Sequence, residues 1–426
     1  VSGAPRQRRV PLFAWWILAL SSLDSILGMI DRQAVAILKA TLKDVFQIGD
    51  SEYGILVSAF LIPYAVFYII CGRLVDRWGS RKSLTVFILI WSLATVLMGA
   101  ASSFEELVVY RAILGAAEAG LVPATVYALV RWFPRDSLAT AYSLRAPIVS
   151  LGPVLAPPIV AGLALAYGWR ASFIVPGAVG FAFALAWWLS DREAPGDRQA
   201  APAIKLGLMD VLRSKLLWGL IAARLISDPL WFFIQYWQAG YFQEVLGVSL
   251  AQVGSILWIP PLVSGLLGIG VGAWSDRLVR RGLPVIQSRV RVMWLVALIS
   301  PAVIVIPHVS NVWIALALFT VAQMMALVWL TFSNILIASI FDRGSMGTAV
   351  GVVNAIGTGG AALFNLAVGP MVDSVGYVAV FTALGFLHPI AAIILVWFYR
   401  GRTLPHQASA GTLGGGDRTE PKPASA

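Results

Sequence analysis

The chain has 426 residues, of which 59% are hydrophobic and only 12% are charged, and its 31 Lys and Arg outnumber its 21 Asp and Glu to give a formal net charge of +10. Soluble domains carry about 25% charged residues, so this composition excludes an ordinary soluble protein and predicts a membrane protein. The single cysteine, Cys71, excludes an intramolecular disulfide and a multi-cysteine metal cluster, and the three histidines are too scattered to indicate a metal site.

Twelve stretches approach the ~20 apolar residues that cross a bilayer, and polar or Gly/Pro breaks separate them. In chain order they are 13–38, 53–71, 83–101, 107–130, 138–166, 171–190, 216–243, 251–274, 290–307, 312–340, 345–372 and 377–399. The first follows Arg6, Arg8 and Arg9, but no small-residue cleavage site comes after it, so we interpret it as a membrane helix and not as a signal peptide. The sequence therefore predicts an all-α membrane protein with 12 transmembrane helices.

Two charged segments repeat at an offset of 200 residues: "CGRLVDRWGSRK" at 71–82 and "GAWSDRLVRRG" at 272–282. The repeat predicts two pseudo-symmetric six-helix bundles in parallel orientation, a plan found in transporters that rock one bundle against the other. The expected organisation is a cytoplasmic N-terminus (1–12), a first bundle (13–190), a polar cytoplasmic linker (191–215), a second bundle (216–400) and a disordered Gly/Ser/Pro-rich tail (401–426).

The distribution of Lys and Arg orients the chain. With both termini in the cytoplasm, only Lys39, Lys43 and Arg170 fall in the outer loops. This positive-inside bias accounts for the net charge of +10, so we expect no nucleic-acid binding.

The repeated loops place a Gly and an Asp-Arg pair at matching cytoplasmic positions of both halves. We expect them to form a cytoplasmic gate that holds the bundles together when the protein opens outward; its residues are Gly72, Asp76, Arg77 and Arg81 in the first half and Asp276 and Arg277 in the second. The alternative is a positive-inside loop with tight-turn glycines, which explains the basic residues but not the paired Gly and Asp.

Eight ionisable residues fall inside the predicted helices with balanced signs: Asp24, Asp31, Glu118 and Asp228 against Arg32, Arg111, Arg145 and Arg224. Each charge at a helix centre costs ~2.5–3.5 kcal/mol, and eight unpaired charges would exceed the ~5–15 kcal/mol of net stability that proteins have. They must therefore face one another, water or a ligand.

Helix rise places three polar side chains at a common depth. Asp31, Tyr64 and Glu118 each lie eleven or twelve residues from the outer end of their helix, about 17–18 Å at ~1.5 Å per residue. We therefore predict a midplane layer that combines a cation able to bind an anion with carboxylates able to bind a proton.

Other interpretations of these charges remain open. Asp31 and Arg32 form a static ion pair in one alternative, and Arg111 is a structural anchor in another. Arg224 and Asp228 are four residues apart and are predicted to pair, with Pro229 breaking their helix near the midplane. We interpret Asp24 and Arg145 as structural or water-facing charges.

The motif at 72–82 resembles the signature loop of the major facilitator superfamily, and "RAILGAAEAGLVPATVYALVRWFP" at 111–134 with "DPLWFFIQYW" at 228–237 resembles its anion:cation symporter family, of the hexuronate and galactonate type. The resemblance implies the major facilitator fold and a site built from particular residues. It implies substrate contacts for Arg32, Tyr64 and Asn354, with Asn334 and Gln235 as further candidates, proton coupling through Asp31 and Glu118, and Arg111 as the arginine that tunes Glu118.

The leading hypothesis is proton-coupled uptake of a small organic anion, such as a sugar acid, across a bacterial inner membrane by alternating access. The expected protein is a monomer with no cofactor, driven by the proton gradient. A drug or metabolite efflux antiporter is an alternative, although "SLGPVLAPPIVAG" at 150–162 lacks the second Gly-Pro pair typical of drug/proton antiporters. An uncoupled facilitator is another, and a membrane enzyme is disfavoured because no nucleophile with its base is evident. The sequence leaves the identity of the carboxylate open.

Overall fold

The computed structural model describes residues 10–191, 211–341 and 343–399. The predicted tail, the terminal arginines and most of the linker lie outside the described residues. The described part consists of α-helices and one 3₁₀ helix, without a strand.

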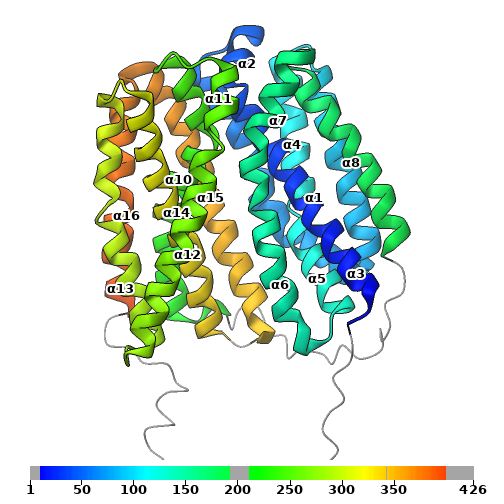
Figure 1. The fold of residues 1–426 in the computed structure, drawn as a ribbon, viewed down its shortest axis with the longest axis vertical. Helices are drawn as coiled ribbons and strands as arrows, with labels where there is room; N and C mark the ends of the chain where they lie inside the picture. The colour runs from blue at the N-terminus through cyan, green and yellow to red at the C-terminus, as the bar shows by residue number, and fades with distance from the viewer. Residues whose placement is uncertain (1–9, 192–210, 342, 400–426) are drawn as a thin grey trace, which may run out of the picture.

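The first half of the chain forms the bundle on one side of Figure 1, coloured blue to green. Its helices are α1 (Leu12–Ile37), α2 (Lys39–Phe46), α3 (Asp50–Ala100), α4 (Phe104–Glu118), α5 (Leu121–Trp132), α6 (Arg135–Val149), α7 (Leu151–Tyr167) and α8 (Ala171–Ser190). The long α3 is two membrane spans that meet at Gly79, whose φ of 74° is the left-handed conformation that glycine tolerates.

The second half forms the bundle beside it, coloured green to orange. Its helices are α10 (Lys215–Glu244), α11 (Leu250–Ile256), α12 (Ile259–Arg280), α13 (Val285–Ala297), the 3₁₀ helix η1 (Ser300–His308), α14 (Val312–Ile340), α15 (Arg343–Val375) and α16 (Tyr377–Tyr399). Figure 1 shows α2 at one end of the molecule, and the start of α1 and the end of α16 toward the other. We call the first the α2 end.

The predicted twelve-helix plan is confirmed, because twelve helical spans of the described residues are long and apolar enough to cross a membrane. The differences are local. The fourth predicted helix is interrupted at Ala119 and Gly120, and the fifth at Ser150. The helix break expected at Pro229 does not occur: α10 continues through it. The carbonyl of Leu225, which Pro229 leaves without its helical donor, faces Gly360 of α15.

The two halves contact each other through α3 and α15, α1 and α10, and α7 and α11. The α3–α15 contact depends on glycine: a Cβ on Gly54 would lie 2.8 Å from the carbonyl oxygen of Asn365, and one on Gly369 would lie 2.3 Å from that of Asp50. No hydrophobic force drives helices together in lipid, so their association depends on close van der Waals packing. Small residues permit this packing because the two backbones can approach each other. Ser58 Oγ adds a hydrogen bond of 3.0 Å to the carbonyl oxygen of Ala362.

Candidate functional site

Arg32 of α1 is held between α3 and α4. Its Nε pairs with a carboxylate oxygen of Glu118, which is fully buried. The guanidinium also lies over two aromatic rings of α3, 4.7 Å from the centroid of Tyr64 and 5.3 Å from that of Phe60. The sequence placed Asp31, Tyr64 and Glu118 at one depth; in the structure Arg32, the residue after Asp31, contacts Tyr64 and Glu118.

Arg111 of α4 is fully buried and contacts the backbone of α1. Its Nη2 donates to the carbonyl of Arg32 at 3.1 Å and its Nη1 to that of Asp31 at 3.4 Å, while its guanidinium lies 4.7 Å from the ring centroid of Phe60. Arg111 thus fixes the backbone that carries Asp31 and Arg32, in keeping with the interpretation of this residue as an anchor.

Two further carboxylates are buried on α1. Asp24 and Asp31 are each 1% exposed, and the described residues give their oxygens no hydrogen-bond donor within bonding geometry. Arg145 of α6 lies near Asp24 but donates to the hydroxyl of Ser25 at 2.5 Å and to the carbonyl of Ser21 at 3.3 Å. The static Asp31–Arg32 pair is therefore not formed, and the arginine is paired to Glu118.

The second half contributes a separate ion pair on α10. Arg224 donates two hydrogen bonds to Asp228, at 2.6 and 2.8 Å, as the four-residue spacing predicted. Its Nη2 also donates to the Oδ1 of Asn354 on α15 at 3.2 Å. Gly357 makes room for this pair, since a Cβ there would meet the carboxylate of Asp228 at 2.1 Å.

Polar contacts connect α1 and α3 to α10 near Arg32. The Nε2 of Gln33 donates to the Oε1 of Gln235 at 3.0 Å, and the hydroxyl of Tyr53 donates to the carbonyl of Tyr236 at 2.5 Å. The ring of Tyr236 lies 5.8 Å from the guanidinium of Arg111. Gln235 therefore lies where the halves meet, whereas none of the contacts described for the chain joins Asn334 to the Arg32 group.

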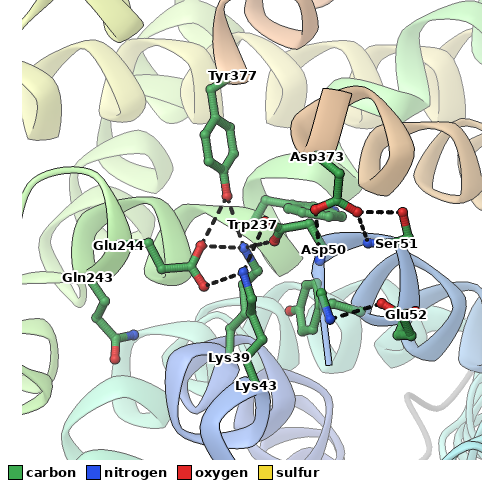
Figure 2. A network of polar contacts seen from close by, with 12 residues as sticks. Lys39, Lys43, Asp50, Ser51, Glu52, Trp237, Gln243, Glu244, Asp373 and Tyr377 are labelled. Carbon is green, nitrogen blue, oxygen red and sulfur yellow. Dashed lines mark hydrogen bonds and ion pairs between the residues drawn. The ribbon is translucent and has the colours of Figure 1, made fainter. Parts of the chain in front are cut away.

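Two lysines and two carboxylates close the α2 end between the halves (Figure 2). Lys39 is 0% exposed and its Nζ lies 2.5 Å from Asp50 and 2.6 Å from Glu244. Lys43 lies 2.9 and 3.3 Å from the same two carboxylates. Because α10 carries Glu244, whereas α2 and the start of α3 carry the other three charges, this group ties the first half to the second.

The buried lysine is enclosed by aromatic rings as well as by charge. Its Nζ donates to the hydroxyl of Tyr377 at 2.9 Å and lies 4.7 Å from the ring centroid of Trp237. Its stem crosses Gly240 of α10, where a Cβ would be only 2.2 Å away. Asp373 of α15 completes the contact by accepting from the backbone N–H groups of Asp50 and Ser51 at the start of α3.

Sequence reasoning did not identify this charged group, since Lys39 and Lys43 were interpreted only as outer-loop cations. One signal was present: the four-residue spacing puts both lysines on one face of a short helix, and Asp50 begins the next helix seven residues after Lys43. The partners Glu244 and Tyr377 are too distant in sequence for spacing to predict the contact.

The repeated charged loops make contacts within their own halves. Arg289 of α13 donates to Asp276 at 2.6 Å, and Arg81 donates to the carbonyl of Trp188 at 2.8 Å with its guanidinium 4.1 Å from that indole ring. Asp76, Arg77 and Arg277 are exposed, and a Cβ on Gly72 or Gly272 would meet nothing within 4 Å. The gate that we expect to join the halves when the protein opens outward stays a prediction.

The fold and the buried charges between its halves define a multi-pass membrane protein with two bundles around a polar interface. The model of the Major Facilitator Superfamily matches residues 22–365. The chain belongs to this superfamily, as its signature loop predicted.

Two curated transporters and one solved structure are similar to most of this chain. The hexuronate transporter of Escherichia coli K12 is 27% identical over 412 residues, covering 91% of this chain and 94% of the relative. The galacturonate transporter of Dickeya chrysanthemi is 27% identical over 307 residues, covering 67% and 88%. Among solved structures, a bacterial homologue of the human lysosomal transporter Spinster, in an inward-facing, unoccupied conformation, superposes with a TM-score of 0.72 at 20% identity over 93% of this chain and 96% of that one.

Proposed function

We propose that the protein takes up a small organic anion, of the sugar-acid class, together with protons across the bacterial inner membrane. The observation that carries the proposal is the Arg32–Glu118 pair beside Tyr64, at the interface of the two halves. Arginine binds carboxylates with two parallel hydrogen bonds, and here its present partner is itself a carboxylate. The names of the relatives support the sugar-acid class.

The pair suggests how anion and proton are coupled. A substrate carboxylate and the carboxylate of Glu118 compete for the same guanidinium. A proton on Glu118 frees Arg32 to bind the substrate, and release of the substrate returns Arg32 to the deprotonated Glu118. Asp31, buried one position before Arg32, is a second carboxyl able to hold a proton. Substrate and proton can drive the change between the outward-open and inward-open conformations only if they bind the two conformations with different affinity.

The positive-inside rule puts the α2 end outside and the termini in the cytoplasm. The contacts of Lys39 and Lys43 then close the outer side of the interface between the halves. In the opposite conformation the charged loops at Asp76 and Asp276 would close the cytoplasmic side. One site between two halves makes a monomer sufficient.

The first experiment is a thermal-shift titration of the purified protein with sugar acids, aromatic acids and dicarboxylates, for the wild type, Arg32→Ala and Arg170→Ala. Arg170 binds the carbonyls of Gly99 and Ala101 at the end of α3 and is the matched control. A ligand at 100 times its Kd adds about 2.7 kcal/mol of stability. We expect a sugar acid to stabilise the wild type and Arg170→Ala but not Arg32→Ala.

Proton coupling is tested with proteoliposomes. Accumulation of that acid against its gradient, abolished by an uncoupler, supports symport. Accumulation that an uncoupler leaves intact contradicts proton coupling, and equilibration without accumulation identifies a facilitator. Stabilisation by cationic or neutral drugs that is insensitive to Arg32→Ala contradicts anion uptake and favours efflux.

A further inference from the structure

A small cavity lies between the halves next to Gln33 and Gln235. Its volume is about 30 Å³, and four glutamines line it: Gln33, Gln235, Gln238 and Gln323. They come from α1, α10 and α14, so both halves contribute. The rest of the lining is apolar, including Pro157 of α7 and Pro261 of α12. None of these four amides takes part in the ion pairs of the site.

Two of these amides have a polar atom without a partner. Gln238 is 8% exposed and Gln323 is 4% exposed, and among the described residues no hydrogen-bond partner reaches the Nε2 of Gln238 or the Oε1 of Gln323. Buried polar atoms are nearly always hydrogen-bonded, so such exceptions point to a missing partner. One of the two atoms is a donor and the other an acceptor.

A hydroxyl group has the complementary chemistry. It accepts a hydrogen bond and donates one, so one hydroxyl in the cavity can accept from Gln238 and donate to Gln323. A carboxylate cannot, because it only accepts, and an ammonium group only donates. A cavity holds one water when about 10–15 Å³ is accessible, so this space fits one or two hydroxyl oxygens but not a whole sugar.

The cavity is linked to the anion site by chain neighbours. Gln33 follows Arg32 on α1, and Gln235 precedes Tyr236, whose ring faces Arg111. The cavity would then take the hydroxyl-bearing end of a ligand whose carboxylate is held by Arg32.

We propose that Gln238 and Gln323, supported by the Gln33–Gln235 hydrogen bond, form a hydroxyl-binding subsite that selects polyhydroxylated carboxylates over carboxylates without hydroxyls. The subsite rests on the proposed function for its carboxylate end. A site built to hydrogen-bond a hydroxyl discriminates strongly against analogues that lack it, because its polar groups are then left unpaired.

The test compares two carboxylates of similar size, D-galacturonate and cyclohexanecarboxylate, by competition binding to the purified protein. We expect the wild type to bind galacturonate at least tenfold more tightly. Gln238→Leu and Gln323→Leu should each weaken galacturonate binding about tenfold and leave cyclohexanecarboxylate binding unchanged. Gln287→Leu, at an exposed position of α13, is the matched control and should retain the preference of the wild type. A circular-dichroism melt confirms that each variant is folded.

The outcomes separate the subsite from the proposed function. An unchanged preference in both folded Gln variants overturns the subsite, while the sensitivity of both ligands to Arg32→Ala continues to support anion binding. Binding of a neutral polyol such as glucose that the Gln variants lose and Arg32→Ala retains supports the subsite and contradicts the anion function. If either variant does not fold, Gln238→Met and Gln323→Met, which approximate the length of the side chain but remove its amide, replace it with the same expected loss of preference. A wild type that binds neither carboxylate nor polyol overturns both proposals.

Discussion

Burial makes the Arg32–Glu118 pair the most consequential contact of the site. The Glu118 side chain is 0% exposed, and removing one partner of a buried pair costs about 3–5 kcal/mol because the other charge is left uncompensated. Asp31 is adjacent in sequence but cannot take the place of Glu118, since neighbouring helical residues point in different directions. A ligand that binds Arg32 must therefore replace a charge as well as fill a space.

Glu118→Gln tests this argument. The variant keeps the shape of the side chain but leaves Arg32 without a counter-charge, so its melting temperature should fall. A sugar-acid carboxylate supplies the missing charge, and we expect it to raise the melting temperature of the variant by more than that of the wild type. Glu105→Gln, at an exposed position of the same helix, is the control. Equal ligand-induced shifts in Glu118→Gln and the wild type would contradict the competition between substrate and Glu118.

Lys43 gives a pH prediction for the α2 end. Burial disfavours its charge, but the hydrogen bond to Asp50 and the charge of Glu244 outweigh that effect and raise its pKa above the usual 10.5. Because the folded-state pKa is the higher one, the stabilisation is fully present below pH 10.5 and is lost as the pH rises through the folded-state value.

The melting temperatures of the wild type and of Lys43→Met, measured as a function of pH, test whether the stabilisation by Lys43 is lost at high pH. Their difference should be constant from pH 7 to about pH 10 and shrink at higher pH. Lys43 is 22% exposed, and partly exposed pairs of this kind contribute about 0.2–1 kcal/mol, so the difference is small at every pH. A difference that disappears between pH 7 and 9 would show that another group controls it. Lys82→Met, in the charged loop far along α3, is the control.

At the scale of helices, the close approach of α3 and α15 depends on positions without a side chain. Gly369→Ala places a methyl group 2.3 Å from the carbonyl oxygen of Asp50, and overpacking of this kind costs about 1–3 kcal/mol. A Cβ on Gly270 of α12 meets nothing within 4 Å, so Gly270→Ala should be neutral or slightly stabilising. Thermal unfolding in nanodiscs should separate the two variants. Equal melting temperatures would show that the helices can shift at no cost.

Hydropathy predicted the helices well because each must satisfy its own backbone and present an apolar surface of fixed length to lipid. The ranges 171–190, 312–340 and 377–399 agree with the structure at both ends. The interruption after Glu118 was missed because Ala119 and Gly120 leave the apolar pattern unchanged. Depth along helices placed Asp31, Tyr64 and Glu118 in one layer, and in the structure Arg32, next to Asp31, contacts the other two. The contact between Lys39 and Glu244, 205 residues apart, depends on how the halves pack, so spacing along the chain could not predict it.

At the scale of the whole molecule, the α2 end can open only if a fully buried lysine leaves two carboxylates and an aromatic enclosure. Desolvated charges that part must be hydrated again, so the contact favours an all-or-none separation of the halves over gradual widening. Opening also has to separate Ser51 of α3 from Asp373 of α15, because the Oγ of Ser51 donates a hydrogen bond of 2.5 Å to the Oδ2 of Asp373.

A reversible cross-link tests whether this separation is needed for transport. Cys71 is the single cysteine, so Cys71→Ser gives a background into which Ser51→Cys and Asp373→Cys are introduced. Joining the two with a cleavable dithiol reagent should abolish uptake of the anion into proteoliposomes, and reduction should restore the rate of the unlinked double variant. Ser51→Cys alone, treated in the same way, should be unaffected. Uptake that persists in fully cross-linked protein would mean that the α2 end stays closed during transport, and alternating access between these two halves would have to be abandoned.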